Sequence, residues 1–216
     1  MKKVLTSFGF GPQQQLLEVS IPTLHKYAHK HSYDLFIPSE NYFTEKTKER
    51  HYSWWKIELI TKLFDNYDRI LWIDADVVIC DFDLDIMSDM DDNSHVGMVV
   101  HKTGIGYVPN CGVWVLDKKC MSWFPELWNY NNLPRSDGFW EQDAMLYKLG
   151  IDTGTCDIKM PDTFPLPWTQ LDYLWNPHAH DQRGIPTNTR FFHATMFQNR
   201  LEVMKQCVSR LSIKNI

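Results

Sequence analysis

Two aspartates that follow an apolar run offer the clearest chemistry in the sequence. Asp74 and Asp76 come directly after residues 70–73, whose letters ILWI are typical of a strand buried on both faces. Ligands of α/β proteins bind at the carboxyl ends of such strands, where these two side chains would lie. Their spacing lets both carboxylates converge on one hard divalent cation such as Mg²⁺ or Mn²⁺. A cation there can neutralise the charge of a departing diphosphate, whereas the same pair in an exposed turn often has no function.

Two classes of enzyme place such a pair after a strand. In nucleotide-sugar transferases the pair holds the metal of a sugar diphosphate, and in one group of phosphohydrolases the first aspartate is a nucleophile. Residues 74–78, DADVV, also fit the phosphohydrolase pattern Asp-x-Asp-x-Val/Thr. That pattern usually follows the first strand, but here other strand candidates precede it, and no late strand after residue 150 ends in an acidic cluster. The phosphohydrolase is therefore kept as the alternative.

Strand patterns alternate with helix patterns along the chain and predict the elements that position this pair. Short apolar runs predict strands at residues 4–5, 33–37, 70–73, 77–80, 96–100 and 113–116. Spacings of three and four predict helices from about residue 13, from a cap at Ser53 to residue 67, at 118–128 and at 140–149. We expect Pro22 to kink or restart the first helix after Ser20. The alternation indicates an α/β fold with a mostly parallel central sheet flanked by helices.

The domain organisation predicted from the sequence is simple. No repeat, low-complexity tract or Pro/Gly-rich linker divides the chain, so residues 1–216 are expected to form a single domain. Asn110 and Gly112 precede the run 113–116, as residues of a turn before a strand would. The last third is rich in proline and aromatic residues and is expected to form loops over a site.

Composition excludes several classes of function. The chain has 22 Lys and Arg against 27 Asp and Glu, a net charge of −5, and therefore no basic field for nucleic acid. No apolar run is long enough to cross a bilayer, and the first residues lack the core of a signal peptide. We therefore expect a cytoplasmic protein whose contact with a membrane, if any, is peripheral. The cysteines form no CxxC pair and are expected to be reduced; they are Cys80, Cys111, Cys120, Cys156 and Cys207.

Six segments of the sequence occur in the order found in one known group of enzymes. They are residues 27–35 (YAHKHSYDL), 55–57 (WKI), 67–76 (YDRILWIDAD), 110–113 (NCGV), 141–145 (EQDAM) and 192–193 (FH). With these segments the chain resembles the GT-A-fold glycosyltransferases, most closely the galactosyl-, mannosyl- and xylosyltransferases and more distantly the glycogenin-like family. The resemblance implies a metal-dependent transfer of a hexose or pentose from a UDP- or GDP-sugar to a carbohydrate-type acceptor, with retention of the anomeric configuration.

The resemblance also implies which residues bind the donor. Asp74 and Asp76 would hold Mn²⁺ or Mg²⁺ together with His193 as the third protein ligand. The residues expected to contact the nucleotide sugar are Thr6, Ser7, Asp74, Ala75, Asn110, Gly112 and Arg200. The family often has a glycine two or three residues after this histidine, where the present chain reads Ala-Thr-Met. A catalytically silent nucleotide-sugar-binding domain is therefore a further alternative.

The segment 141–143 carries the residues that the resemblance places at the reacting carbon. Gln142 would lie near the anomeric carbon and stabilise an oxocarbenium-like centre without bonding to it. Glu141 and Asp143 are the candidates for holding donor hydroxyls, although acidic residues also suit a helix N-terminus on dipole grounds alone. The acceptor hydroxyl would attack from the face that the diphosphate leaves, and the leaving phosphate can itself take the proton.

Aromatic residues make up 14% of the chain, and their positions predict two different uses. Three tryptophans fall in predicted helix and strands and are expected to pack in the core: Trp54, Trp72 and Trp114. Trp168, Tyr173 and Trp175 lie in the late Pro-rich segment, where their rings could stack on the apolar face of an acceptor sugar. Weaker candidates for the same contact are His178 and His180.

Overall fold

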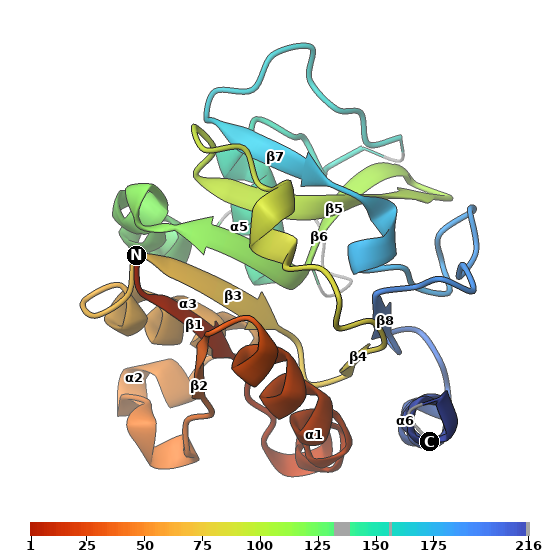
Figure 1. The fold of residues 1–216 in the computed structure, drawn as a ribbon. Helices are drawn as coiled ribbons and strands as arrows, with labels where there is room; N and C mark the ends of the chain where they lie inside the picture. Colours follow the sequence, from red (N-terminus) through yellow and green to blue (C-terminus); the bar gives the residue numbers. More distant parts are fainter. Residues whose placement is uncertain (132–138, 156, 215–216) are drawn as a thin grey trace.

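The computed structural model describes residues 1–131, 139–155 and 157–214, which form a six-stranded sheet covered by helices and a separate two-stranded ribbon (Figure 1). The strands are β1 (Lys3–Thr6), β2 (Asp34–Phe36), β3 (Arg69–Ile73), β4 (Val77–Ile79), β5 (Val96–Thr103), β6 (Gly106–Asp117), β7 (Trp168–Leu171) and β8 (Phe191–His193). The sheet order is β2-β1-β3-β6-β5-β7, and β4 pairs with β8. Three of the five pairings in the sheet are parallel, and β6 runs antiparallel to both of its neighbours. The predicted α/β class with a mostly parallel sheet is confirmed.

The helices lie in two layers, one on each face of the sheet (Figure 1). They are α1 (Gln14–Lys30), α2 (Glu45–Lys48), α3 (Tyr52–Leu63), α4 (Phe124–Asn129), α5 (Glu141–Lys148) and α6 (Arg200–Lys214). Alternate residues of β3 belong to different cores: Ile70 and Trp72 pack with α3, α4 and α5, whereas Leu71 and Ile73 pack with α1 and the β4–β8 ribbon. Side chains alternate across a strand, so β3 is buried on both faces, as its apolar run predicts.

Two details of the predicted helices, a restart at Pro22 and a cap at Ser53, are wrong, whereas a kink at Pro22 stays a prediction. Helix α1 continues through Pro22 without a restart, because its buried stripe, which includes Leu17 and Leu24, packs in the core on both sides of the proline. One missing backbone donor does not outweigh that burial. Helix α3 is capped by His51 rather than Ser53, since the Nδ1 atom of His51 accepts a hydrogen bond from the Ser53 backbone amide at 3.3 Å.

The segment around Asn110 and Gly112 is part of strand β6, and not the turn before it that we expected. Its pairing with β3 continues to Val113, but its register against β5 shifts between Gly97 and Val99. Such an irregularity frees backbone groups from the ladder and is common beside functional sites. The bulge therefore presents the Asn110–Gly112 backbone to the cleft at the end of β3.

The last third of the chain contains more regular structure than its composition predicts. Strand β7 joins the edge of the main sheet next to β5, β8 pairs antiparallel with β4, and α6 packs against α1. Three- and four-residue strands are too short to show a period in the sequence. The loops that we expected over a site are thus partly replaced by elements that bring residues 191–193 beside residues 77–79.

The burial of three tryptophans agrees with the sequence analysis. Trp54, Trp72 and Trp114 are at most 3% exposed, so their prediction as core residues is confirmed. The described cysteines, Cys80, Cys111, Cys120 and Cys207, form no disulfide with one another, and Cys156 lies outside the described residues. Within the same ranges, none of the helices has the length and apolar character needed to cross a bilayer.

Candidate functional site

A cavity of about 910 Å³ opens where the carboxyl ends of β1 and β3 meet the bulge of β6. Its wall includes the loop after β1, the first turns of α3 and α5, and the segment between β7 and β8. Residues 74–76 form its floor, together with Asn110 and Gly112. The cavity therefore lies at the edge of the sheet where α/β proteins bind ligands.

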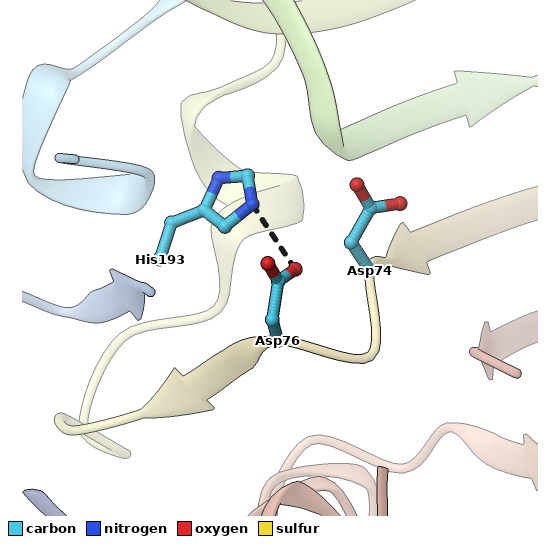
Figure 2. Close-up of side chains that lie close together, drawn as sticks. All are labelled: Asp74, Asp76 and His193. Atoms are coloured by element: carbon cyan, nitrogen blue, oxygen red, sulfur yellow. Dashed lines mark ion pairs between the residues drawn. The ribbon is translucent and has the colours of Figure 1, made fainter. Parts of the chain in front are cut away.

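Asp74, Asp76 and His193 converge on this floor from two elements (Figure 2). One ligand atom from each residue lies within 4.8 Å of the other two. Antiparallel pairing of β4 with β8 places His193 opposite Val77, and this brings His193 Nε2 to 3.2 Å from Asp76 Oδ1. The pair predicted from sequence and its distant third partner are thus brought together by the ribbon.

The carboxylate of Asp76 is held in its charged form. Burial by itself would raise the pKa of Asp76, but His193 and Arg200 outweigh that effect and lower the pKa to about 2. Arg200 begins helix α6, and its Nη1 atom lies 3.0 Å from Asp76 Oδ2. An ionised, buried carboxylate is the form that binds a divalent cation.

The imidazole of His193 is oriented by a partner on its other nitrogen. His193 Nδ1 lies 2.9 Å from the amide oxygen of Asn176, which assigns the hydrogen to Nδ1 because an amide oxygen can only accept. With this hydrogen on Nδ1, the neutral imidazole has its lone pair on Nε2, the atom that faces Asp76 Oδ1. A cation held by Asp76 would meet that lone pair. This arrangement matches histidine ligands of metals, whose second nitrogen usually donates to an oxygen behind it. The donor set of two carboxylates and one imidazole suits Mn²⁺ and also accepts Mg²⁺.

Gly112 makes room for this imidazole. A Cβ atom added to Gly112 would lie 2.4 Å from His193 Cε1 and 2.8 Å from Asn110 Oδ1. Neither distance is compatible with a real side chain, so only glycine lets the ring pack against strand β6. The role visible in the structure is therefore a close approach between strand β6 and His193, the candidate metal ligand.

Lys56 joins the first aspartate to the segment at the start of α5. Its ammonium lies 2.9 Å from Asp74 Oδ1 and 2.8 Å from Glu141 Oε1, and its side chain is only 5% exposed. Burial alone would lower the pKa of Lys56, but Asp74 and Glu141 outweigh it and raise the pKa above its usual value. The sequence analysis assigned this residue no role, although a lysine on the apolar face of α3, between Trp55 and Ile57, signals a buried charge.

The side chains expected at the reacting carbon have different surroundings. Gln142 lines the cavity, and its Oε1 atom accepts hydrogen bonds from the Cys111 amide at 3.0 Å and from Asn110 Nδ2 at 3.3 Å. Glu141 also lines the cavity, and burial raises its pKa despite the ion pair with Lys56. Asp143 is fully buried and does not belong to the described wall of the cavity.

A continuous hydrogen-bonded chain connects Gln142 with the cluster of Asp74, Asp76 and His193. Asn110 Nδ2 donates to Gln142, while Asn110 Oδ1 accepts from Asn176 Nδ2 at 2.9 Å. Asn176 in turn accepts from His193, which contacts Asp76. Each amide thus has its orientation set by its neighbours, so the positions of Gln142 and His193 depend on each other.

Several predicted contacts with the nucleotide sugar are not visible in the structure. Thr6 and Ser7 are fully buried, and the Thr6 hydroxyl donates to the Phe36 carbonyl at 2.8 Å. The described residues that line the cavity at this point are Phe8, Gly9 and Phe10. Ala75 and Arg200 do line the cavity, as the sequence analysis expects of donor-binding residues.

The aromatic residues predicted for the acceptor lie elsewhere. Trp175 has no exposed surface and packs in the core, because the short 3₁₀ helix Tyr173–Trp175 turns its ring inward. The Tyr173 hydroxyl donates to the Gly184 carbonyl at 2.6 Å, and Trp168 packs against Phe164. None of the three belongs to the described wall of the cavity, so this placement lends no support to an acceptor role for them.

Histidines from the same segment do reach the cavity. His178 and His180 line it, and the His178 ring packs against His101 with centroids 3.8 Å apart and planes inclined by 31°. Burial, followed by His101 and His193, lowers the pKa of His178 to about 2, so this imidazole is neutral. His101 also lines the cavity and was missed in the sequence, because its contact with Asp181 at 3.1 Å spans 80 residues.

Comparisons with known proteins agree on one class of enzyme. The model of a family described as glycosyl transferase family 8 matches residues 13–137, more than half of the chain. A glycosyltransferase involved in the glycosylation of the major capsid of PBCV-1 has a similar structure, with a TM-score of 0.68, 19% identity, and coverage of 95% of this chain and 100% of that one. No curated protein matches the sequence.

Two further solved structures extend the structural likeness. The glycosyltransferase GlyE of Streptococcus pneumoniae TIGR4 matches with a TM-score of 0.62 and 13% identity over 99% of this chain and 63% of its own. An active-site mutant of LgtC matches with a TM-score of 0.51 and 12% identity over 97% of this chain and 96% of its own. At 12–13% identity these two structures show only that the fold is similar. Membership of the family rests on the sequence match over residues 13–137.

Proposed function

Because the chain belongs to glycosyl transferase family 8, we propose that it is a metal-dependent, retaining glycosyltransferase that moves a sugar from a UDP- or GDP-sugar to a hydroxyl of a carbohydrate-type acceptor. The observation that carries the metal dependence is the convergence of Asp74, Asp76 and His193 within 4.8 Å on the floor of the cavity. These three residues would hold a divalent cation, which would supply positive charge against the departing diphosphate. Side chains of this protein are proposed to bind the diphosphate, the reacting carbon and a donor hydroxyl, as described next.

The proposed diphosphate site combines the metal ligands with Arg200. This arginine lines the cavity, and its side chain is 37% exposed, so it can contact a phosphate oxygen while it remains beside Asp76. Guanidinium groups bind phosphate through charge-assisted hydrogen bonds. Arg200 would therefore hold the diphosphate on the side of the cavity formed by the start of α6.

Gln142 is proposed to stabilise the reacting carbon of the donor sugar. Its amide is held by Asn110 and the Cys111 backbone, so the electron-rich oxygen stays in a fixed place in the cavity wall. A neutral amide can stabilise a developing positive centre without forming a stable covalent bond. Attack by the acceptor hydroxyl on the face that the diphosphate leaves then retains the configuration, and the leaving phosphate takes the proton.

Glu141 is the better placed of the two carboxylates for holding a donor hydroxyl. It lines the cavity, and its Oε2 atom has no hydrogen-bond partner among the residues that the structure describes. A buried carboxylate oxygen without a partner is costly, and a sugar hydroxyl that donates to it would remove that cost. Asp143 is fully buried outside the cavity wall, so its proposed part is the support of the helix start.

The proposed function is tested by thermal shift and turnover with a panel of UDP- and GDP-sugars, with and without Mn²⁺. We expect stabilisation only when nucleotide and metal are both present, because a ligand that binds the native state raises its stability. The variant Asp76→Ala should lose this shift. Phosphate release from simple phosphomonoesters without an acceptor would favour the phosphohydrolase alternative. Metal-dependent binding of a nucleotide sugar, with no turnover of any sugar in the panel, would favour the silent binding domain.

A further inference from the structure

Trp140 presents an exposed aromatic ring on the cavity, directly before Glu141 and Gln142. The residue is 37% exposed, and its indole lies nearly parallel to the His51 imidazole, with centroids 3.9 Å apart and planes inclined by 10°. Both residues line the cavity, although His51 caps α3 and Trp140 precedes α5. Because His51 covers one face of the indole, a flat ligand can stack only on the other face.

The backbone of Trp140 is strained in a way that supports a function for its side chain. Its φ of 40° and ψ of −117° are rare for a residue other than glycine. Such strain persists where the surrounding structure imposes it, and it is concentrated at sites of function. Here the turn places the indole and Gln142 in the same cavity wall. The turn is closed by the backbone N–H of Gln142, which donates to the Phe139 carbonyl at 2.8 Å.

We propose that the apolar face of the acceptor's sugar ring stacks on the Trp140 indole, with the His51 ring as its backing. This inference rests on the proposed function, because it assigns the acceptor end of the same cavity. Pyranose rings carry C–H groups on one face, and large aromatic rings bind such surfaces with little loss of conformational freedom. A ring stacked here would place its hydroxyls beside Gln142, where the donor's reacting carbon is proposed to lie.

A nucleobase is the other flat ligand that could use an aromatic ring of this cavity. The exposed ring that suits a nucleobase is Tyr52, which is 40% exposed and lines the cavity. Its ring centroid lies 6.4 Å from that of Phe10, a residue of the loop after β1. That loop follows Thr6 and Ser7, which the resemblance assigns to the nucleotide. Trp140 lies on the other side of the His51 ring, whose centroid is 6.3 Å from that of Tyr52. It directly precedes Glu141 and Gln142, which are proposed to contact the donor sugar. These positions favour a sugar on Trp140.

The proposal is tested by saturation-transfer NMR with four probes: the methyl glycosides of glucose, galactose, mannose and xylose. Spectra are recorded with and without UDP and Mg²⁺, for the wild type and for Trp140→Ala, Trp140→Phe and Tyr147→Ala. We expect at least one glycoside to bind the wild type through one face of its ring, and to bind Trp140→Ala about three- to tenfold more weakly, the range for loss of an aromatic contact. Trp140→Phe should retain part of the affinity. Tyr147 is 63% exposed on α5 but lies outside the described cavity wall, so its variant should bind as the wild type does.

Three results would overturn the assignment of Trp140. The first is equal glycoside binding by Trp140→Ala and the wild type, and the second is no binding of any probe by the wild type. The third is a loss of UDP or GDP affinity in Trp140→Ala as large as the loss for the glycoside, which would place a nucleobase on the ring. Nucleotide binding by the wild type is measured in the same series by calorimetry with Mg²⁺. Its absence would contradict the proposed function itself, and the glycoside spectra recorded without nucleotide would still decide the role of Trp140.

Discussion

The ammonium of Lys56 lies 2.9 Å from Asp74 Oδ1, so the first aspartate after β3 is held by a cation that has almost no contact with solvent. Trp72 Nε1 donates to the same oxygen at 2.7 Å. Both side-chain hydrogen bonds that the described residues make to Asp74 end on Oδ1, which leaves Oδ2 for a ligand. Lys56 thereby orients a proposed metal ligand and, through Glu141, the start of α5.

Replacement of Lys56 by methionine should destabilise the protein by about 3–5 kcal/mol, because it leaves the buried Glu141 carboxylate without its partner. The double variant Lys56→Met/Glu141→Gln should recover much of this loss, since it leaves no unpaired charge at position 141. Urea unfolding of the wild type, both single variants and the double variant measures the coupling. A double variant as unstable as Lys56→Met would contradict this account of the ion pair.

Replacement of Gly112 by alanine should abolish metal-dependent binding of the nucleotide. The new Cβ would lie 2.4 Å from His193 Cε1 and force the imidazole away from Asp76. We expect a loss of stability of about 1–3 kcal/mol as well, the usual cost of overpacking. The matched control is Gly97→Ala, whose Cβ would meet the Leu171 side chain at 3.2 Å, outside the described cavity wall. Thermal shift with UDP or GDP and Mn²⁺ checks the prediction, and an unchanged shift in Gly112→Ala would show that His193 does not need its observed position.

Removal of the amide behind His193 should weaken metal binding without removing a ligand. Asn176 is fully buried and accepts the hydrogen bond from His193 Nδ1, so Asn176→Ala leaves the imidazole free to turn. Loss of such a partner typically costs about 10- to 100-fold in metal affinity. Calorimetric titration of Mn²⁺ in the presence of nucleotide measures the change, with the exposed Asn66→Ala as control. Equal Mn²⁺ affinity in Asn176→Ala and the wild type would argue against His193 as a ligand.

Stability should fall in acid partly through Asp181. Burial alone would raise the pKa of Asp181, but hydrogen bonds from Arg183 and His101 outweigh it and lower the pKa well below its usual value. The unfolded chain, with a carboxyl pKa of about 3.9, therefore binds this proton more readily than the folded protein does. The stability contributed by Asp181 is complete above that value and is lost as the pH falls below it.

The variant Asp181→Asn tests this pH dependence. We expect it to be about 1–3 kcal/mol less stable than the wild type at pH 7, because it weakens the contacts to a buried group. The difference should shrink as the pH is lowered from about 5 to 2, where the wild-type carboxylate takes up its proton. Asp162→Asn, at an exposed position, is the control. A difference in unfolding free energy that is the same at pH 7 and pH 3 would disprove the role of the charge.

Much of the fold follows from local patterns. The run ILWI before Asp74 predicts a doubly buried strand, and alternate residues of β3 do pack in two different cores. Periodicity also placed α5 and the buried tryptophans, because both signals depend on neighbours within a few residues. The same reasoning missed β8, since a three-residue strand has no measurable period. It also missed α6, although Leu201, Met204 and Val208 recur there at spacings of three and four.

The order of residue types along the chain is enough to predict that two carboxylates follow a buried strand of an α/β protein, and hence the type of chemistry to expect at that edge. The surroundings of these carboxylates depend on how distant elements pack. His193 reaches Asp76 because β4 pairs with β8, and Lys56 reaches Asp74 and Glu141 because α3 packs beside β3. The exposure of Trp140 and the burial of Trp175 were decided in the same way. The type of a side chain and its local spacing can be read from the sequence. Its distant partners and its exposure depend on how separate elements pair and pack.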